Sequence, residues 1–167
     1  MINLYCLIWG ECVQVFRICD KAEVDKIFKD MDFKDIGASG KMHKRKPGEA
    51  TVNNHVYDED EMYMHFFPKF SDLFYINLEK GKCVCTYDIP EEILDASLGY
   101  GEYMDLFTYS IPRKVPEYCI NNKLLKFEYL TQVKLLTNDI SYIDFLSEEP
   151  LDDFYELIYS KQASKHK

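Results

Sequence analysis

The chain has 167 residues, enough for one domain that buries its own core without help from a cofactor. Hydrophobic residues make up 47% and aromatic residues 15%, a composition that excludes a disordered chain. The formal net charge is −9, with the acidic excess in residues 57–167, so extended binding to a nucleic-acid backbone is not expected.

The opening residues and the cysteines bear on the location of the protein. The start of the chain has no basic leader, and the apolar stretch that ends at Trp9 is too short for a bilayer. Six cysteines lie mostly inside apolar runs, where a free thiol packs as a small hydrophobic group. We therefore expect a cytoplasmic protein with reduced cysteines and no membrane contact, with three disulfides as the alternative.

The first predicted element is a β-hairpin. Residues 2–9 and 12–18 are rich in β-branched and aromatic side chains. They flank Gly10 and Glu11, a pair that suits a two-residue hairpin turn.

A helix and a long loop are predicted next. Asp20 and Glu23 have capping-box spacing, and apolar residues recur at helical intervals up to Asp32. Residues 33–56 lose this periodicity and gather glycine, proline and asparagine, which indicates a loop. Loops of this length are uncommon unless they have a function.

Four elements are predicted between this loop and the middle of the chain. They are a strand over 62–67, a short helix over 70–78, a strand over 82–89 and a helix over 90–98. The aromatic and glycine-rich residues 99–103 are predicted to form a loop.

The last third of the chain is predicted to hold two strands and two helical segments. The strands cover 115–120 and 124–136 and are expected to pair with each other. Helical spacing of apolar residues follows over 139–145 and 150–158.

The mixture of strands and helices, without internal repeats, predicts an α+β fold. We expect a single domain over residues 1–160, built on an antiparallel or mixed twisted sheet with short flanking helices. Residues 161–167 form a basic tail.

The predicted loop carries the strongest basic cluster of the chain. Residues 41–46 hold four cationic side chains, among them Lys44 and Arg45, and such a cluster can wrap a phosphate. A solvated run of charges is the alternative. The chain has neither a P-loop ending nor a Gly-x-Gly-x-x-Gly motif, which disfavours the common nucleotide-binding loops.

The sequence does not predict a metal site. Cys83 and Cys85 would place two thiols on one face of a strand, but further ligands at zinc spacing are missing. Cys119 has no neighbouring histidine in sequence that would activate it. We therefore assign no cysteine or histidine to a metal.

Three polar residues interrupt apolar strands and are the candidate functional residues. Arg17 and His65 lie within apolar or aromatic runs, and Glu117 starts a strand that otherwise reads as buried. The alternatives are an arginine that points outward, a hydrogen-bonded core histidine, and a salt bridge of Glu117 with Lys114 or Lys126.

An early strand arginine, a middle aromatic strand and a late strand glutamate resemble the layout of the ADP-ribosyltransferase-like superfamily, over residues 5–133. The resemblance implies an enzyme that uses NAD to modify a macromolecule, with Glu117 as the catalytic carboxylate that stabilises an oxocarbenium-like state. The residues implied to bind the dinucleotide are Arg17, His65, Tyr75, Lys44 and Arg45.

A second hypothesis is a small non-enzymatic binding protein or inhibitor, of phage or host-defence type. Residues 139–156 carry seven acidic groups and no basic one, so they could dock on a basic surface of a protein partner. An ordinary soluble surface is the alternative. A tyrosine-rich surface, for which residues 99–103 are a candidate, could serve the same purpose.

Overall fold

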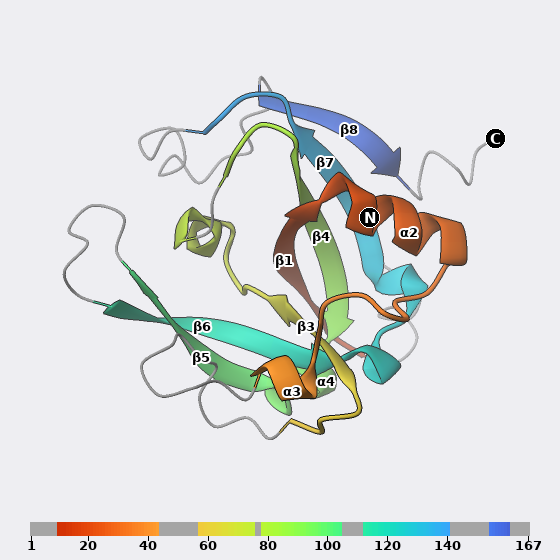
Figure 1. Ribbon diagram of the computed structural model, residues 1–167, viewed down its shortest axis with the longest axis vertical. Coiled ribbons are helices and arrows are strands. Elements are labelled where there is room, and N and C mark those ends of the chain that lie inside the picture. The colour runs from red at the N-terminus through yellow and green to blue at the C-terminus, as the bar shows by residue number, and fades with distance from the viewer. Residues whose placement is uncertain (1–9, 44–56, 76–77, 105–111, 141–153, 161–167) are drawn as a thin grey trace.

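A computed structural model describes residues 10–43, 57–75, 78–104, 112–140 and 154–160, and their strands form two antiparallel four-stranded sheets (Figure 1). In spatial order, the first sheet contains β1 (Cys12–Asp20), β4 (Lys82–Pro90), β7 (Leu130–Leu136) and β8 (Tyr155–Ser160). The second contains β2 (Ala38–Ser39), β3 (Met62–Phe66), β6 (Pro112–Asn121) and β5 (Leu98–Met104). The strands of the second sheet run across those of the first.

Short helices flank the sheets, so the predicted α+β class is confirmed. The α-helices are α2 (Lys21–Asp30), α3 (Gly40–His43) and α4 (Glu91–Asp95). The 3-10 helices are η1 (Phe70–Tyr75), η2 (Asn122–Leu124) and η3 (Phe127–Tyr129). The longest of the described helices, α2, has 10 residues, and none is long and apolar enough to cross a membrane.

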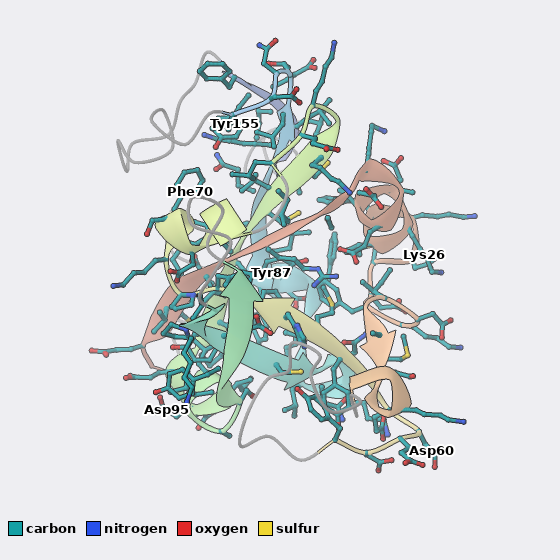
Figure 2. All side chains as sticks on the ribbon, turned by 60° about the vertical axis from the view of Figure 1, so that its left-hand side comes forward. Lys26, Asp60, Phe70, Tyr87, Asp95 and Tyr155 are labelled. Carbon is teal, nitrogen blue, oxygen red and sulfur yellow. The ribbon has the colours of Figure 1, made fainter. Side chains whose placement is uncertain are left out.

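The main core fills the space between the two sheets and α2. Tyr87 of β4 is completely buried, and Figure 2 shows it in the middle of the molecule. Its ring lies edge-to-face on Phe66 of β3, with ring centroids 4.8 Å apart. Val24 and Ile27 bring the apolar side of α2 into the same core. Burial of such large side chains is the main stabilising contribution to a domain of this size.

Among the described residues, one isolated backbone bridge joins the two sheets. Phe16 of β1 and Phe67, just after β3, exchange two N–H···O hydrogen bonds of 2.8 and 2.7 Å. Because residues opposite each other across such a bridge share a face, this contact places Arg17 beside the core side of β3. The bridge therefore sets where the first candidate residue lies relative to the second sheet.

The predicted helix is present, but its predicted capping box is wrong. Asp20 occupies the N-cap position without a capping hydrogen bond from its side chain. Its carboxylate instead accepts a 2.7 Å bond from Lys82 of the neighbouring strand. The helix ends at Asp30, and its C-cap residue Met31 adopts the left-handed conformation and donates its backbone N–H to the Ile27 carbonyl.

Two predicted elements of the second half are wrong in type. Residues 99–103 are not a loop but the middle of β5. In the region of the predicted final helix over 150–158, the residues from Tyr155 onward form the strand β8. A short apolar run is compatible with both the helical and the strand periodicity. Here the residues form a strand because they pair with the edge of β7. The ammonium group of Lys134 lies 5.1 Å from the centre of the Tyr155 ring and adds to this pairing.

The predicted long strand over 124–136 is also divided, and its predicted pairing is wrong. The 3-10 helices η2 and η3 occupy its beginning, and only β7 is extended. β6 pairs with β3 and β5, whereas β7 pairs with β4 and β8, so the two segments belong to different sheets. Asn122 fixes the turn between them because its amide donates two 2.7 Å bonds, to the carbonyls of Phe33 and Ile36.

Several predictions fall on segments outside the described residues. They are the first strand of the hairpin, most of the basic cluster in the loop, most of the acidic segment and the basic tail. Within the predicted loop, Ala38–Ser39 pairs with β3 as β2, and Gly40–His43 forms one turn of helix.

The prediction that all cysteines are free thiols is wrong for one of the described cysteines. Cys12 is disulfide-bonded. Cys19, Cys83, Cys85 and Cys119 are free. A disulfide is uncommon in a reducing compartment, so the cytoplasmic location stays a prediction.

Candidate functional site

Glu117 lies completely buried in the second sheet and pairs with His65 of the neighbouring strand. The register places His65 opposite Cys119, two residues beyond Glu117, so all three share one face of the sheet. The carboxylate oxygen Oε1 lies 2.8 Å from His65 Nδ1. The Glu117 side chain is 1% exposed and the His65 side chain 24%, and the Nε2 atom of His65 is itself buried, so both polar ends of the pair are shielded from solvent.

Strand alternation explains why a carboxylate is buried at this position. Val115, Glu117 and Cys119 point to one side of β6, and all three are buried. On β5, Gly101 lies opposite Val115 and Gly99 lies opposite Glu117. Since glycine carries no side chain, β5 adds no side-chain atoms beside the Glu117 carboxylate.

Two tyrosines and a thiol extend this face beyond the His65–Glu117 pair. Tyr57 and Tyr63 meet edge-to-face with ring centroids 5.1 Å apart, and they pack with Cys119. Burial raises the pKa of the Cys119 thiol to about 12; the Tyr57 hydrogen bond lowers it and the Glu117 charge raises it. The thiol is therefore protonated near neutral pH and does not act as a nucleophile in this arrangement.

Burial also raises the pKa of the Tyr57 phenol, and its hydrogen bond with Cys119 and the Glu117 charge raise it further. The face around His65 and Glu117 thus holds a neutral phenol and a neutral thiol near neutral pH. Neither group supplies a positive charge to an anionic ligand.

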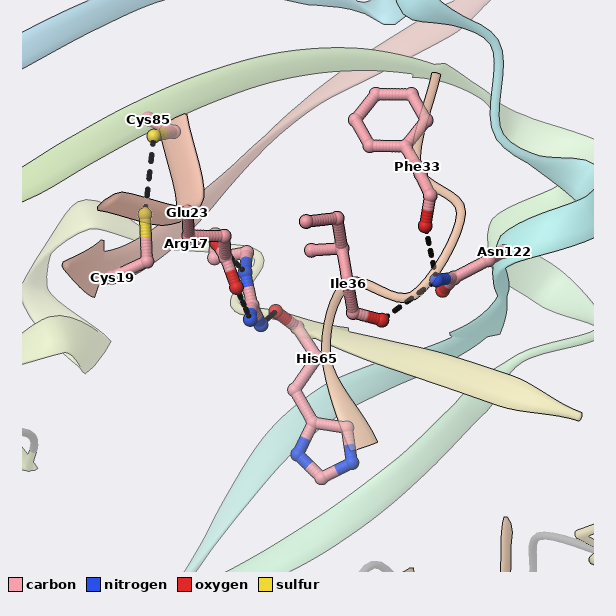
Figure 3. Close-up of polar contacts among 8 residues, drawn as sticks. All are labelled: Arg17, Cys19, Glu23, Phe33, Ile36, His65, Cys85 and Asn122. Atoms are coloured by element: carbon pink, nitrogen blue, oxygen red, sulfur yellow. Dashed lines mark hydrogen bonds and ion pairs between the residues drawn. The ribbon is translucent and has the colours of Figure 1, made fainter. Parts of the chain in front are cut away.

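Arg17 is held by an ion pair and a backbone carbonyl (Figure 3). Its Nε and Nη2 atoms donate to the two carboxylate oxygens of Glu23 at 2.9 and 2.6 Å. Its Nη1 donates to the His65 carbonyl at 3.2 Å. Burial lowers the Arg17 pKa, but the hydrogen bonds and charge of Glu23 raise it by more, so the guanidinium stays charged.

Arg17 and Glu117 lie on opposite sides of β3. Figure 3 shows the guanidinium at the His65 carbonyl and the imidazole pointing away from it. Alternation along β3 agrees, because Met64 and Phe66 face the main core whereas His65 faces Glu117. The structure therefore brings Arg17 and His65 together through the backbone, but it does not place the guanidinium and the carboxylate in one cleft.

The other predicted dinucleotide-binding residues are not placed at this site. Tyr75 ends η1, and its side chain is outside the description. Lys44 and Arg45 also lie outside the described residues. Their predicted roles stay predictions.

Two features were missed by sequence reasoning. One is Glu23, the partner of Arg17, which the sequence pattern indicates only as part of a capping box. The other is the outer face of the β5–β6 ribbon, hidden because residues 99–103 were predicted as a loop. The alternation of glycine and larger residues in that segment is the signal that indicates a strand with one bare side.

We use the name outer ribbon face for the partly exposed side of β5 and β6 that carries Leu98, Tyr100, Pro116 and Tyr118. The register pairs Leu98 with Tyr118 and Tyr100 with Pro116, so the four side chains are contiguous. Leu98 is 43% and Tyr100 39% exposed, and Pro116 is exposed as well. Tyr118 is half-buried and also packs against the main core. Tyr118 lies opposite Phe66, so this face continues the core-facing side of β3 and β6, and its apolar side chains become exposed toward β5.

Acidic and basic groups border the outer ribbon face. Burial raises the pKa of the Tyr118 phenol, and the charges of Asp95 and Glu91 on α4 raise it further, so these carboxylates lie near its ring. Figure 2 shows Asp95 at the periphery of the molecule. Lys114 is exposed on the same side of β6. The border is thus acidic at the α4 end, whereas at the far end Lys114 lies opposite Glu102 in the register.

Within the described part of the chain, no three His, Cys, Asp or Glu side chains come together in a way that would hold a metal ion. No protein-family model, curated protein or solved structure matches this chain.

Proposed function

We propose that the chain is a non-enzymatic binding protein that engages a protein partner through the outer ribbon face. The observation that carries the proposal is the β5–β6 ribbon, which buries the charged Glu117 on one side and exposes Leu98, Tyr100 and Pro116 on the other. Positions where a fold breaks the rule of apolar inside and polar outside are where function is expected.

The outer ribbon face has the chemistry of a small protein interface. Contiguous exposed apolar side chains gain free energy when a partner removes them from water, at about 25 cal/mol per Å² of apolar surface. Tyrosine is enriched at such interfaces because its ring is apolar and its hydroxyl can hydrogen-bond. Tyr100 is therefore expected to be the central contact of this face.

The charge of the protein indicates what kind of partner fits. The net charge of −9 and the carboxylates of Glu91 and Asp95 favour a basic partner surface. The same net charge disfavours a second copy of this chain as the partner. We therefore infer a basic protein surface with an apolar depression that receives the Tyr100 ring.

Photo-crosslinking from position 100 tests this proposal. A photoreactive phenylalanine analogue in place of Tyr100 is expected to form a defined adduct with one basic protein in cells that make this chain. With the partner identified and purified, Tyr100→Ala is expected to weaken its binding by about thirtyfold, or about 2 kcal/mol, as for a central aromatic contact.

Leu157 supplies the matched control, because it is 52% exposed but lies on β8 of the other sheet. The analogue at position 157 is expected to give no such adduct, and Leu157→Ala to leave the affinity within about twofold. Equal crosslinking from both positions, an adduct with a second copy of the chain, or full affinity of Tyr100→Ala would overturn the proposal.

A second candidate is the NAD-using transferase that the sequence resemblance implies, and the paired His65 and Glu117 are the observation that favours it. A carboxylate that orients an imidazole is a common arrangement for proton transfer. The engagement of Arg17 with Glu23 counts against it, because the residue implied to hold the dinucleotide already has a carboxylate partner.

Nicotinamide release from NAD separates the two candidates. Under the binding proposal, neither the wild-type chain nor Glu117→Gln releases nicotinamide above the rate without protein. Release by the wild type that Glu117→Gln lacks would favour the transferase. A Tyr100→Ala control should release nicotinamide at the wild-type rate in that case, because Tyr100 lies on the opposite face of the ribbon.

A further inference from the structure

Three free cysteines gather where β1 pairs with β4. Cys19, Cys83 and Cys85 occupy alternate positions of their strands and face the main core. The Sγ atoms of Cys19 and Cys85 lie 3.8 Å apart, the contact drawn in Figure 3. Cys85 is completely buried, whereas Cys19 lies near the end of its strand and is half-buried.

We propose that Cys19 and Cys85 form an oxidisable pair, a modification site that a hydroperoxide converts into a disulfide between β1 and β4. A disulfide has an S–S distance of about 2.05 Å, so the two sulfurs must approach by roughly 1.8 Å. Because Cys19 lies opposite Cys83 and diagonally from Cys85, the end of β1, where Asp20 is the last strand residue, must shift along with the Cys19 side chain. The bond would tie the end of β1 to the middle of its neighbour.

The chemical step needs no oxidant other than the hydroperoxide. The Cys19 thiolate attacks one peroxide oxygen, the O–O bond breaks, and a sulfenic acid and water result after proton transfer. The Cys85 sulfur then attacks the Cys19 sulfur, the S–S bond forms, and the hydroxyl group leaves as a second water. Two thiols and one hydrogen peroxide thus give one disulfide and two waters. Both thiols are oxidised and the peroxide is reduced.

Cys12 gives independent support for this inference. It lies at the other end of the same strand and is disulfide-bonded, so β1 already carries one oxidised cysteine. Disulfides persist where the surroundings are oxidising. Under such conditions a second pair of adjacent thiols is exposed to the same oxidants.

The pair is expected to react slowly near neutral pH and faster as the pH rises. The hydrogen bond with Cys85 and burial raise the pKa of Cys19 well above its ordinary value, and the nearby Arg17 guanidinium lowers it by less. The thiolate fraction therefore increases about tenfold for each pH unit below that pKa, and the oxidation rate follows it. The other titratable groups beside Cys19 are Glu23, Lys82, Cys83 and Tyr87.

Peptide mapping of the full-length protein after hydrogen peroxide treatment tests the inference. At pH 9 the protein is expected to lose about 2 Da, and non-reducing digestion should give one new linked peptide that contains Cys19 and Cys85. The rate at pH 7 should be about a hundredfold lower. Cys83→Ser should still form the bond, whereas Cys85→Ser should not lose the mass.

Cys119 is the internal control, because it is a buried thiol in the other sheet and should remain a thiol under the same treatment. A Cys19–Cys83 bond would overturn the inference; fragment ions between the two cysteines of the linked peptide, or a mass loss that Cys85→Ser keeps and Cys83→Ser abolishes, would reveal it. A wild-type protein that keeps both thiols at pH 9 would also overturn the inference, a result that does not depend on whether any variant folds.

Discussion

Replacing Glu23 with alanine is expected to lower the free energy of unfolding by about 3 kcal/mol, because it leaves the Arg17 guanidinium without its carboxylate partner. The two side chains are only 15% and 16% exposed, and two hydrogen bonds of 2.9 and 2.6 Å join them. Water cannot fully replace the lost carboxylate at this depth. Urea unfolding followed by circular dichroism measures the effect.

Asp25 provides a matched control on the same helix. Its pair with Lys21 is exposed, with 45% and 48% of the side chains accessible, so Asp25→Ala should cost no more than about 0.5 kcal/mol. A double variant, Arg17→Met with Glu23→Leu, should recover most of the loss, since it removes both charges. If Glu23→Ala and Asp25→Ala cost the same, the Arg17 pair is no more than an ordinary surface ion pair.

Replacing Glu117 with alanine is expected to destabilise the protein by about 3 kcal/mol, because it leaves a cavity and removes the carboxylate from His65. Glu117→Gln keeps the shape and a carbonyl acceptor at the position that lies 2.8 Å from His65 Nδ1. Its cost should be smaller, about 1 to 1.5 kcal/mol. The same urea experiment distinguishes the loss of charge from the loss of volume.

Lys114 lies on the same strand and is exposed, so Lys114→Ala should stay within about 0.5 kcal/mol of the wild type. A Glu117→Ala protein as stable as Lys114→Ala would mean that the buried pair contributes nothing to the fold. A Glu117→Gln protein as unstable as Glu117→Ala would assign the whole effect to the charge.

The fold class and most elements of the first half could be predicted from the sequence, because helical and strand periods are strong there. The strands β5 and β8 of the second half are harder to predict from the sequence. Residues 99–103 contain two glycines, which by composition indicate a loop, although here they leave space opposite Val115 and Glu117 on a strand. The strand β8 carries an apolar spacing that also fits a helix, and only its contact with β7 decides the type.

The site could be predicted only in part, and for a physical reason. That Arg17, His65 and Glu117 are unusual within apolar strands is visible in the sequence, and two of them do form a pair. Which side of a strand each residue faces depends on register, and a shift of one residue reverses it. The partner of Arg17 comes from the following helix, six residues away, and no strand pattern indicates that contact.

The bridge between Phe16 and Phe67 couples the two sheets during unfolding. The Arg17 bond to the His65 carbonyl lies directly beside it, so backbone and side-chain contacts hold the first sheet to the second at one corner. Opening either sheet there breaks the Glu23 pair and uncovers Tyr87 at the same time. The two sheets therefore belong to one cooperative unit and unfold together, rather than as separate halves.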